Sequence, residues 1–228
     1  MKQLPLNLTL RVAQDGDEFI VTPCNEMAAS MVESWPSWSG QMRALNVTGA
    51  ALSGKSHLGA VWQHVSHASL ISRLDEMVMA DTTEQKHFLL DNVRPGPEWD
   101  DEQLFLLLTR IKDENGSVMI LSQTPISQME WSLPDLRSRL RAFTLASIGT
   151  PDDELITLLL EKYFADRQLA VPDTVLQYVV ARIERSFQSV SDVVEDMDQQ
   201  ALATKKKVSL GLARDVLARQ ASGKVEIC

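Results

Sequence analysis

One eight-residue segment constrains the fold of this chain more than any other feature. Residues 49–56 read Gly-Ala-Ala-Leu-Ser-Gly-Lys-Ser and match the pattern G-x-x-x-x-G-K-[ST] in full. In this pattern the backbone N–H groups of the loop wrap phosphates, the lysine reaches the terminal phosphates, and the last hydroxyl binds Mg²⁺. The loop works only between a buried strand and a helix, whose N-terminus adds positive charge. The segment therefore predicts an α/β fold with a nucleotide site.

The sequence around the loop supplies the strand and the helix that it needs. Leu45 to Thr48 reads as a short strand, and apolar residues recur at helical spacing from Lys55 to about Val65. Strands alternating with helices predict right-handed βαβ units and a parallel sheet with helices on both faces. The further predicted elements are strands at 87–91, 117–121 and 143–148 and a helix at 101–114.

The pattern changes at Gly149-Thr150-Pro151, after which only helices are predicted. We therefore expect an α/β domain over 13–149 and a small all-α domain over 150–222, with a tail at 223–228. The N-terminal residues 1–12 are treated separately below. The four helices expected in the second domain span 152–167, 172–184, 189–204 and 209–220.

A nucleotide site of this kind also needs an acidic residue at the end of a neighbouring strand, and Asp91 is placed to supply it. It ends the apolar run His87–Leu90, which reads as a buried strand. There it would hold Mg²⁺ together with Ser56. The next residue, Asn92, carries an amide that cannot take a proton from an attacking water. Slow intrinsic hydrolysis is therefore expected.

Composition narrows the class of protein. The formal net charge of −9 argues against a large nucleic-acid footprint, which needs a surplus of Lys and Arg. Clusters at 137–141 and 205–207 are basic, and we expect them to be solvated faces. We expect no membrane span, no secretory signal and a cytoplasmic protein in which Cys24 and Cys228 are thiols.

Several segments together resemble the DnaA branch of the AAA+ family, in particular its Hda-type regulators. Residues 19–28, called the base segment below, are similar to the DnaA segment that lies against adenine. Residues 54–58 continue the phosphate loop in the form typical of this branch. Residues 89–92 resemble an Asp-Asn version of the acidic strand end, and residues 133–140 resemble the box that carries an arginine finger. The region 181–187 lies where such proteins carry their second sensor.

The resemblance implies a role for each matching residue. ADP or ATP with Mg²⁺ would be the cofactor, and Arg139 would be a finger that acts on a nucleotide bound by a partner, with Arg137 and Arg141 at the interface or surface. Asp91 and Asn92 would serve the chain's own nucleotide, Ser56 and Asp91 would hold the metal, and Arg185 would reach the phosphates. The residues expected around the nucleotide are Asn25, Gly49, Ala51, Leu52, Ser53, Gly54, Lys55, Ser56 and His57.

Two sensor positions depart from the family pattern. The first sensor should be a polar residue just after residues 117–121, and both Gln123 and Thr124 qualify. The second is an arginine in DnaA, whereas the closest alignment here gives Gln188, with Arg185 one turn earlier. A weakened second sensor, together with Asn92, indicates a protein that holds its nucleotide more than it consumes it.

The N-terminus is similar to the clamp-binding peptide of Hda-type proteins. In such a peptide Gln3 makes polar contacts while Leu6 and Leu8 fill an apolar pocket, with Leu4 beside them. The alternative is an ordinary edge strand that continues through Thr9 to Val12. If the peptide interpretation holds, the DNA polymerase III sliding clamp is a partner.

The function that the resemblance implies is regulatory. A nucleotide-bound protein docked on the clamp would stimulate hydrolysis of DnaA-bound ATP and so prevent re-initiation. DnaA would be a partner, a homodimer is compatible with the fold, and no sequence-specific DNA binding is expected because no helix-turn-helix region is seen. Two alternatives stay open: an autonomous AAA+ ATPase, and an adaptor that recruits DnaA or another replication protein without stimulating hydrolysis.

Overall fold

The computed structural model describes residues 10–11, 18–38, 42–74 and 85–223. The predicted clamp peptide, with Gln3, Leu4, Leu6 and Leu8, lies outside these residues. The chain divides into two compact units, residues 1–149 and 150–228, which are described separately. None of the described helices is long and apolar enough to cross a membrane.

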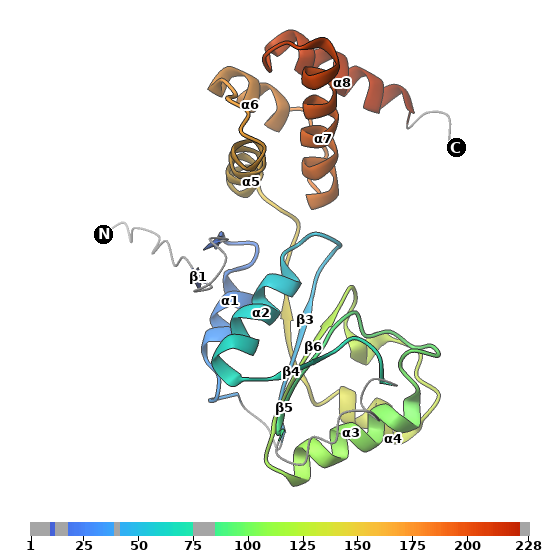
Figure 1. The fold of residues 1–228 in the computed structure, drawn as a ribbon. Helices are drawn as coiled ribbons and strands as arrows, with labels where there is room; N and C mark the ends of the chain where they lie inside the picture. The colour runs from blue at the N-terminus through green and yellow to red at the C-terminus, as the bar shows by residue number, and fades with distance from the viewer. Residues whose placement is uncertain (1–9, 12–17, 39–41, 75–84, 224–228) are drawn as a thin grey trace. The chain divides into compact units, whose positions relative to one another are not determined.

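Five parallel strands form the centre of the first unit (Figure 1). Their order across the sheet is β4-β5-β6-β3-β7, and every neighbouring pair is parallel. All five strands therefore end at the same edge of the sheet, and the predicted parallel α/β core is confirmed. The strands are β3 (Arg43–Thr48), β4 (Ser69–Ile71), β5 (His87–Leu90), β6 (Ser117–Ser122) and β7 (Thr144–Ser147).

Helices cover both faces of this sheet (Figure 1). A Cβ on Gly59 of α2 would lie 2.9 Å from Leu121 Cδ1 and 3.2 Å from Leu89 Cδ2, so α2 approaches these two side chains closely. Leu90 and Ile120 instead pack with apolar residues of the opposite helices. Successive strand side chains point to opposite faces, so strands buried on both faces read as the continuous apolar runs seen in the sequence. The helices are α1 (Glu26–Glu33) and α2 (Lys55–Ser66) on one face, and α3 (Asp101–Asp113) and α4 (Pro134–Leu140) on the other.

Two short elements complete this unit as described. A two-residue antiparallel pair, β1 (Leu10–Arg11) and β2 (Glu18–Phe19), precedes α1. A 3₁₀ turn, η2 (Ile126–Gln128), follows β6. Helix α3 begins where the sequence predicts, because the Asp100 side chain accepts hydrogen bonds from two free N–H groups of its first turn.

A buried amide organises the end of β6. Asn46 lies in the middle of β3 and is 1% exposed. Its Nδ2 donates to the Ser122 hydroxyl at 2.9 Å and to the Ile120 carbonyl at 3.1 Å. Its Oδ1 accepts from the Ile126 N–H at 3.1 Å. Asn46 thus fixes the loop after β6 relative to the strand that leads into residues 49–56.

The second unit is built from four helices around their own core. They are α5 (Asp153–Asp166), α6 (Asp173–Val180), α7 (Phe187–Thr204) and α8 (Leu210–Gly223). Ile156, Phe164, Val179 and Met197 are among the side chains buried between them.

The boundary between α6 and α7 differs from the sequence prediction, and α8 ends at Gly223 rather than at residue 220. Helix α6 ends at Val180 rather than near residue 184, and α7 begins at Phe187 rather than at Ser189. The Ser186 hydroxyl accepts a hydrogen bond from the Ser189 N–H at 3.1 Å. It therefore caps α7, and the chain has to leave α6 before it.

Replacing Asn46 with Leu should destabilise the first unit. The Ile126 N–H would be left buried without an acceptor, which costs about 1–3 kcal/mol. The measurement is the free energy of unfolding in urea. Gln123→Leu is the matched control, because Gln123 is exposed and the same change there should stay within about 0.5 kcal/mol. Equal unfolding midpoints for the two variants would show that the network adds no stability.

Candidate functional site

The loop between β3 and α2 has the backbone shape that an anion site needs. Leu52 and Gly54 have φ of 62° and 89°, in the left-handed region that turns successive N–H groups toward a common hollow. A Cβ on Gly54 would lie 2.7 Å from Cε2 of Phe19, so both the φ and the space require glycine there. Helix α2 begins at the next residue, which brings the positive end of its dipole to the loop.

The inner and outer parts of the loop differ in exposure. Gly49 is buried, and a Cβ there would lie 2.6 Å from the Ser53 hydroxyl. Ser53 is buried as well, whereas Ala51 and Leu52 are exposed. The loop is therefore packed against the sheet on one side and open to solvent at its tip.

Lys55 lies folded over this loop. Its Nζ donates to the carbonyl oxygens of Gly49 at 2.8 Å and Ala50 at 2.6 Å. Burial lowers the pKa of Lys55 below its ordinary value, and the carboxylate of Asp91 partly opposes this. Phosphate oxygens would offer the ammonium stronger, charge-assisted hydrogen bonds than these carbonyls do.

Ser56 and Asp91, the two residues that the sequence predicts as Mg²⁺ ligands, lie at the same edge of the sheet as the loop. Asp91 directly follows β5, donates its N–H to the Ile71 carbonyl at 3.0 Å and interacts electrostatically with Lys55. Ser56 is exposed in the first turn of α2. Among the described residues no group of three or more His, Cys, Asp or Glu could hold a metal. One hydroxyl and one carboxylate suit Mg²⁺, which keeps several waters and takes phosphate oxygens as its other ligands.

Asn92 follows Asp91 in the left-handed conformation, with φ of 55°. Its side chain is exposed. An amide in this place can donate a hydrogen bond to a water molecule, but it cannot act as a general base.

The base segment packs against the loop. The Gly149 N–H donates to the Cys24 carbonyl at 2.8 Å, and the Phe19 ring lies 5.5 Å from the half-buried ring of His57. Asn25 is 2% exposed and uses its amide locally, accepting from the Thr22 N–H and donating to the Ile20 carbonyl. Asn25 therefore shapes the segment, while Phe19, which the sequence analysis did not single out, is the side chain that reaches the loop.

The strand end that should carry the first sensor is occupied by Ser122. Its hydroxyl donates to the Thr124 carbonyl at 2.8 Å, and its own carbonyl accepts from the Gly49 N–H at 3.3 Å. Gln123 and Thr124 are both exposed just beyond it. Sequence reasoning missed Ser122 and Asn46. The available signal was a polar residue inside or at the end of an apolar run.

The two candidates for the second sensor both make contacts within the helical unit. Arg185 Nη2 lies 2.8 Å from Asp153 Oδ1, and both side chains are exposed. Gln188 Nε2 donates to Asp192 Oδ1 at 2.7 Å. A role for Arg185 at the phosphates stays a prediction.

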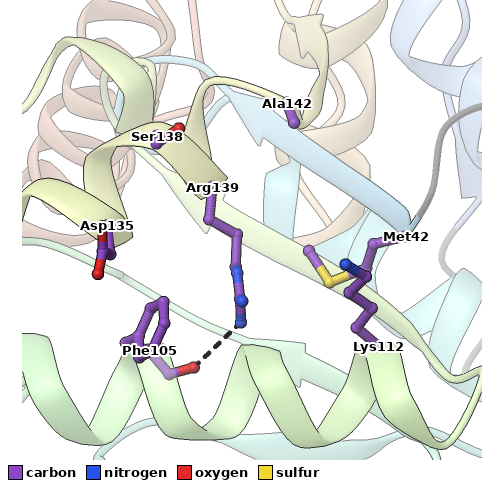
Figure 2. A pocket seen from close by; sticks show the side chains of 7 residues that line it. All are labelled: Met42, Phe105, Lys112, Asp135, Ser138, Arg139 and Ala142. Carbon is purple, nitrogen blue, oxygen red and sulfur yellow. Dashed lines mark hydrogen bonds between the residues drawn. The ribbon is translucent and has the colours of Figure 1, made fainter.

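Arg139 lines a pocket of about 410 Å³ with residues of α3 and α4 (Figure 2). These two helices cover the face of the sheet opposite to α2 (Figure 1). Its guanidinium carbon lies 4.4 Å from the centroid of the Phe105 ring, and Nη1 donates to the Phe105 carbonyl and to the Thr109 hydroxyl. Arg137 and Arg141 are exposed, as expected of a solvated face, but Arg139 is half-buried. The pocket is lined by Met42, Phe105, Lys112, Asp135, Ser138, Arg139 and Ala142.

This pocket lies at the opposite edge of the sheet from residues 49–56. Met42 directly precedes β3, and Ala142 lies just before β7. The phosphate loop, in contrast, follows the last residue of β3. The six residues of β3, at about 3.3 Å each, separate the two edges by roughly 20 Å. Arg139 therefore cannot contact a nucleotide held by its own loop.

The chain shares its fold with replication initiation proteins of known structure. Domain III of the Thermotoga maritima replication initiation protein DnaA superposes with a TM-score of 0.71 at 19% identity, covering 88% of this chain and 94% of that chain. AMPPCP-bound DnaA from Aquifex aeolicus gives a TM-score of 0.59 at 15% identity, with 80% of this chain and 64% of that chain covered.

Sequence comparisons agree with this likeness and refine it. DnaA of Thermoanaerobacter sp. (strain X514) is 23% identical over 240 aligned positions, which cover 95% of this chain and 54% of that protein. The family described as Hda, lid domain, matches residues 152–217. The chain is a DnaA-related AAA+ protein with a lid of the Hda type. This AAA+ chain spans about half the length of the curated DnaA relatives that it matches.

Proposed function

We propose that this AAA+ protein binds ADP or ATP with Mg²⁺ at residues 49–56 and regulates replication initiation by acting on DnaA. The complete phosphate loop and the AMPPCP-bound DnaA of the same fold support the first part. The Hda-type lid and the DnaA relatives support the second.

The chain's own residues would bind the nucleotide rather than consume it. Loop N–H groups would surround the phosphates, and Lys55 would exchange its two carbonyl acceptors for phosphate oxygens. Ser56 and Asp91 would hold Mg²⁺, which neutralises phosphate charge when bound. Asn92 offers no base to activate water. We therefore expect a bound nucleotide that persists and keeps the protein in one state.

The observation that carries the regulatory proposal is the position of Arg139. It lies at the sheet edge far from its own loop, beside a hollow open to a partner. A guanidinium brought against the γ-phosphate of another molecule stabilises the charge that develops during transfer, a contribution of roughly 10³-fold or more in rate. To reach the γ-phosphate of a partner's nucleotide, Arg139 would give up its hydrogen bond to the Thr109 hydroxyl. Phosphate oxygens would then offer the guanidinium stronger, charge-assisted hydrogen bonds.

Docking on the sliding clamp is the remaining part of the proposal, and it rests on the resemblance of residues 3–8 alone. An extended peptide with Gln3 for polar contacts and Leu6 and Leu8 for an apolar pocket would place the regulator on DNA-loaded clamps.

Lys55→Ala should weaken nucleotide binding about 10- to 100-fold. The variant loses charge-assisted hydrogen bonds worth roughly 1.5–3 kcal/mol. Calorimetric titration with ADP and with ATP, in Mg²⁺ and in excess chelator, measures the change. Lys86→Ala, at an exposed lysine outside the loop, is the control and should bind normally. Native affinity in Lys55→Ala would place the nucleotide elsewhere or show that the loop does not bind it.

Arg139→Ala should abolish most of the stimulation of DnaA-bound ATP hydrolysis, measured with the native protein, clamp and DNA. Arg137→Ala is the matched control, an exposed arginine two residues away in the same helix, and should keep most of the activity. Equal activity of both variants would remove Arg139 as the finger. If the native protein binds the clamp without stimulating hydrolysis, the adaptor alternative is favoured.

Changing Gln3, Leu6 and Leu8 together to alanine should eliminate clamp binding in a surface-binding assay while nucleotide binding stays normal. A variant with Asn7 and Thr9 changed to alanine alters the same segment outside these three positions, and it should bind the clamp. Clamp binding that survives the triple change would assign the segment to an ordinary edge strand.

A further inference from the structure

A groove runs between α7 and α8 on the helical unit. Three adjoining hollows of about 490, 520 and 560 Å³ form it. They lie next to one another, because Gln220 lines all three and Glu184 and Ser189 line two of them. Gln220 Nε2 donates to Asp196 Oδ2 at 2.6 Å, which joins α8 to α7 across the middle of the groove.

One end of the groove is cationic. The guanidinium carbon of Arg182 lies 3.9 Å from the centroid of the Tyr178 ring, and that of Arg214 lies 5.7 Å from the same centroid. Arg182 is fixed further by donating to the Tyr178 carbonyl. Both arginines are exposed, and neither lies within 4.0 Å of a carboxylate oxygen of the described residues. Glu184 also lines this hollow, so the two arginines on one ring outnumber the single acid there and leave this end net positive.

The adjoining part of the groove is acidic. Asp192, Glu195 and Asp196 line it. Each of these carboxylates accepts a hydrogen bond from a glutamine amide, supplied by Gln188, Gln199 and Gln220 in turn. An amide satisfies the oxygen without removing its charge, so this stretch stays negative beside the two arginines.

We propose that this groove binds a peptide segment of a protein partner that is acidic at one end and basic at the other. The charges of such a segment would complement both stretches of the groove. Leu217 and Ala218 line the cationic end beside the arginines and offer apolar contact. A nucleic-acid strand carries a phosphate at every step, and its backbone would meet Asp192, Glu195 and Asp196 after leaving the arginines.

The test uses a short dye-labelled peptide with alternating Glu and Leu in its first half and alternating Lys and Leu in its second, followed by fluorescence anisotropy. Arg182→Glu/Arg214→Glu should weaken binding about tenfold or more, since two favourable ion pairs become repulsive. The matched control is Lys206→Glu/Lys207→Glu, which makes the same change in net charge at two exposed lysines of the same unit. It should bind almost as the native protein does, and circular dichroism should show both variants folded.

Other results overturn the proposal. The proposal is wrong if the native protein does not bind the peptide. It is also wrong if the arginine and the lysine double variants weaken peptide binding equally, because the attraction would then depend only on net charge. If a labelled single-stranded oligonucleotide binds through the two arginines better than the peptide does, the groove is a nucleic-acid site. Self-association that the arginine variant abolishes, measured by sedimentation, would assign the groove to a second copy of the chain.

Discussion

Strand β3 is the constraint on which both candidate sites of the α/β unit depend. It lies between β6 and β7, and a different candidate site lies at each of its two ends. The phosphate loop leaves its carboxyl end, and Met42 at its amino end lines the pocket of Arg139. Because all five strands run the same way, the loops after them collect at one edge and the helix ends before them at the other. The phosphate loop and the arginine are therefore kept apart by the length of one strand.

The phosphate edge is organised by polar groups inside the sheet as much as by the loop. Asn46 holds Ser122 and Ile126, and the Ser122 carbonyl accepts from the first residue of the phosphate loop. These bonds connect the strand before the loop to the neighbouring strand end. Lys55, whose pKa is lowered by burial, then rests on carbonyl oxygens of the loop. To bind an anion, Lys55 would exchange these carbonyl oxygens for oxygens of the anion, and the sheet beneath would change little.

The sequence predicted the parallel α/β core, with strands β3, β5, β6 and β7, helices α2 and α3, and the loop, because those depend on periodicity and on a motif with strict geometry. It did not predict the shorter elements β4, α1 and α4. Other features depend on tertiary contacts that periodicity does not report. The early end of α6 follows from the cap at Ser186, and the importance of Ser122 follows from Asn46, which is distant in sequence. Arg139 contacts Phe105 and Thr109 because α4 packs against α3. The Arg185–Asp153 pair likewise joins residues far apart in the chain.

The separation of the two edges has a consequence for assembly. A contact that brings the arginine edge of one molecule to the phosphate edge of another uses two different surfaces, so it is head-to-tail rather than two-fold symmetric. Such a contact leaves one phosphate edge and one arginine edge uncovered at its two ends. The same contact can therefore repeat beyond two molecules, and the resulting row of molecules has two different ends. A molecule joining a row of partners at one end would offer its guanidinium, and at the other end it would receive one.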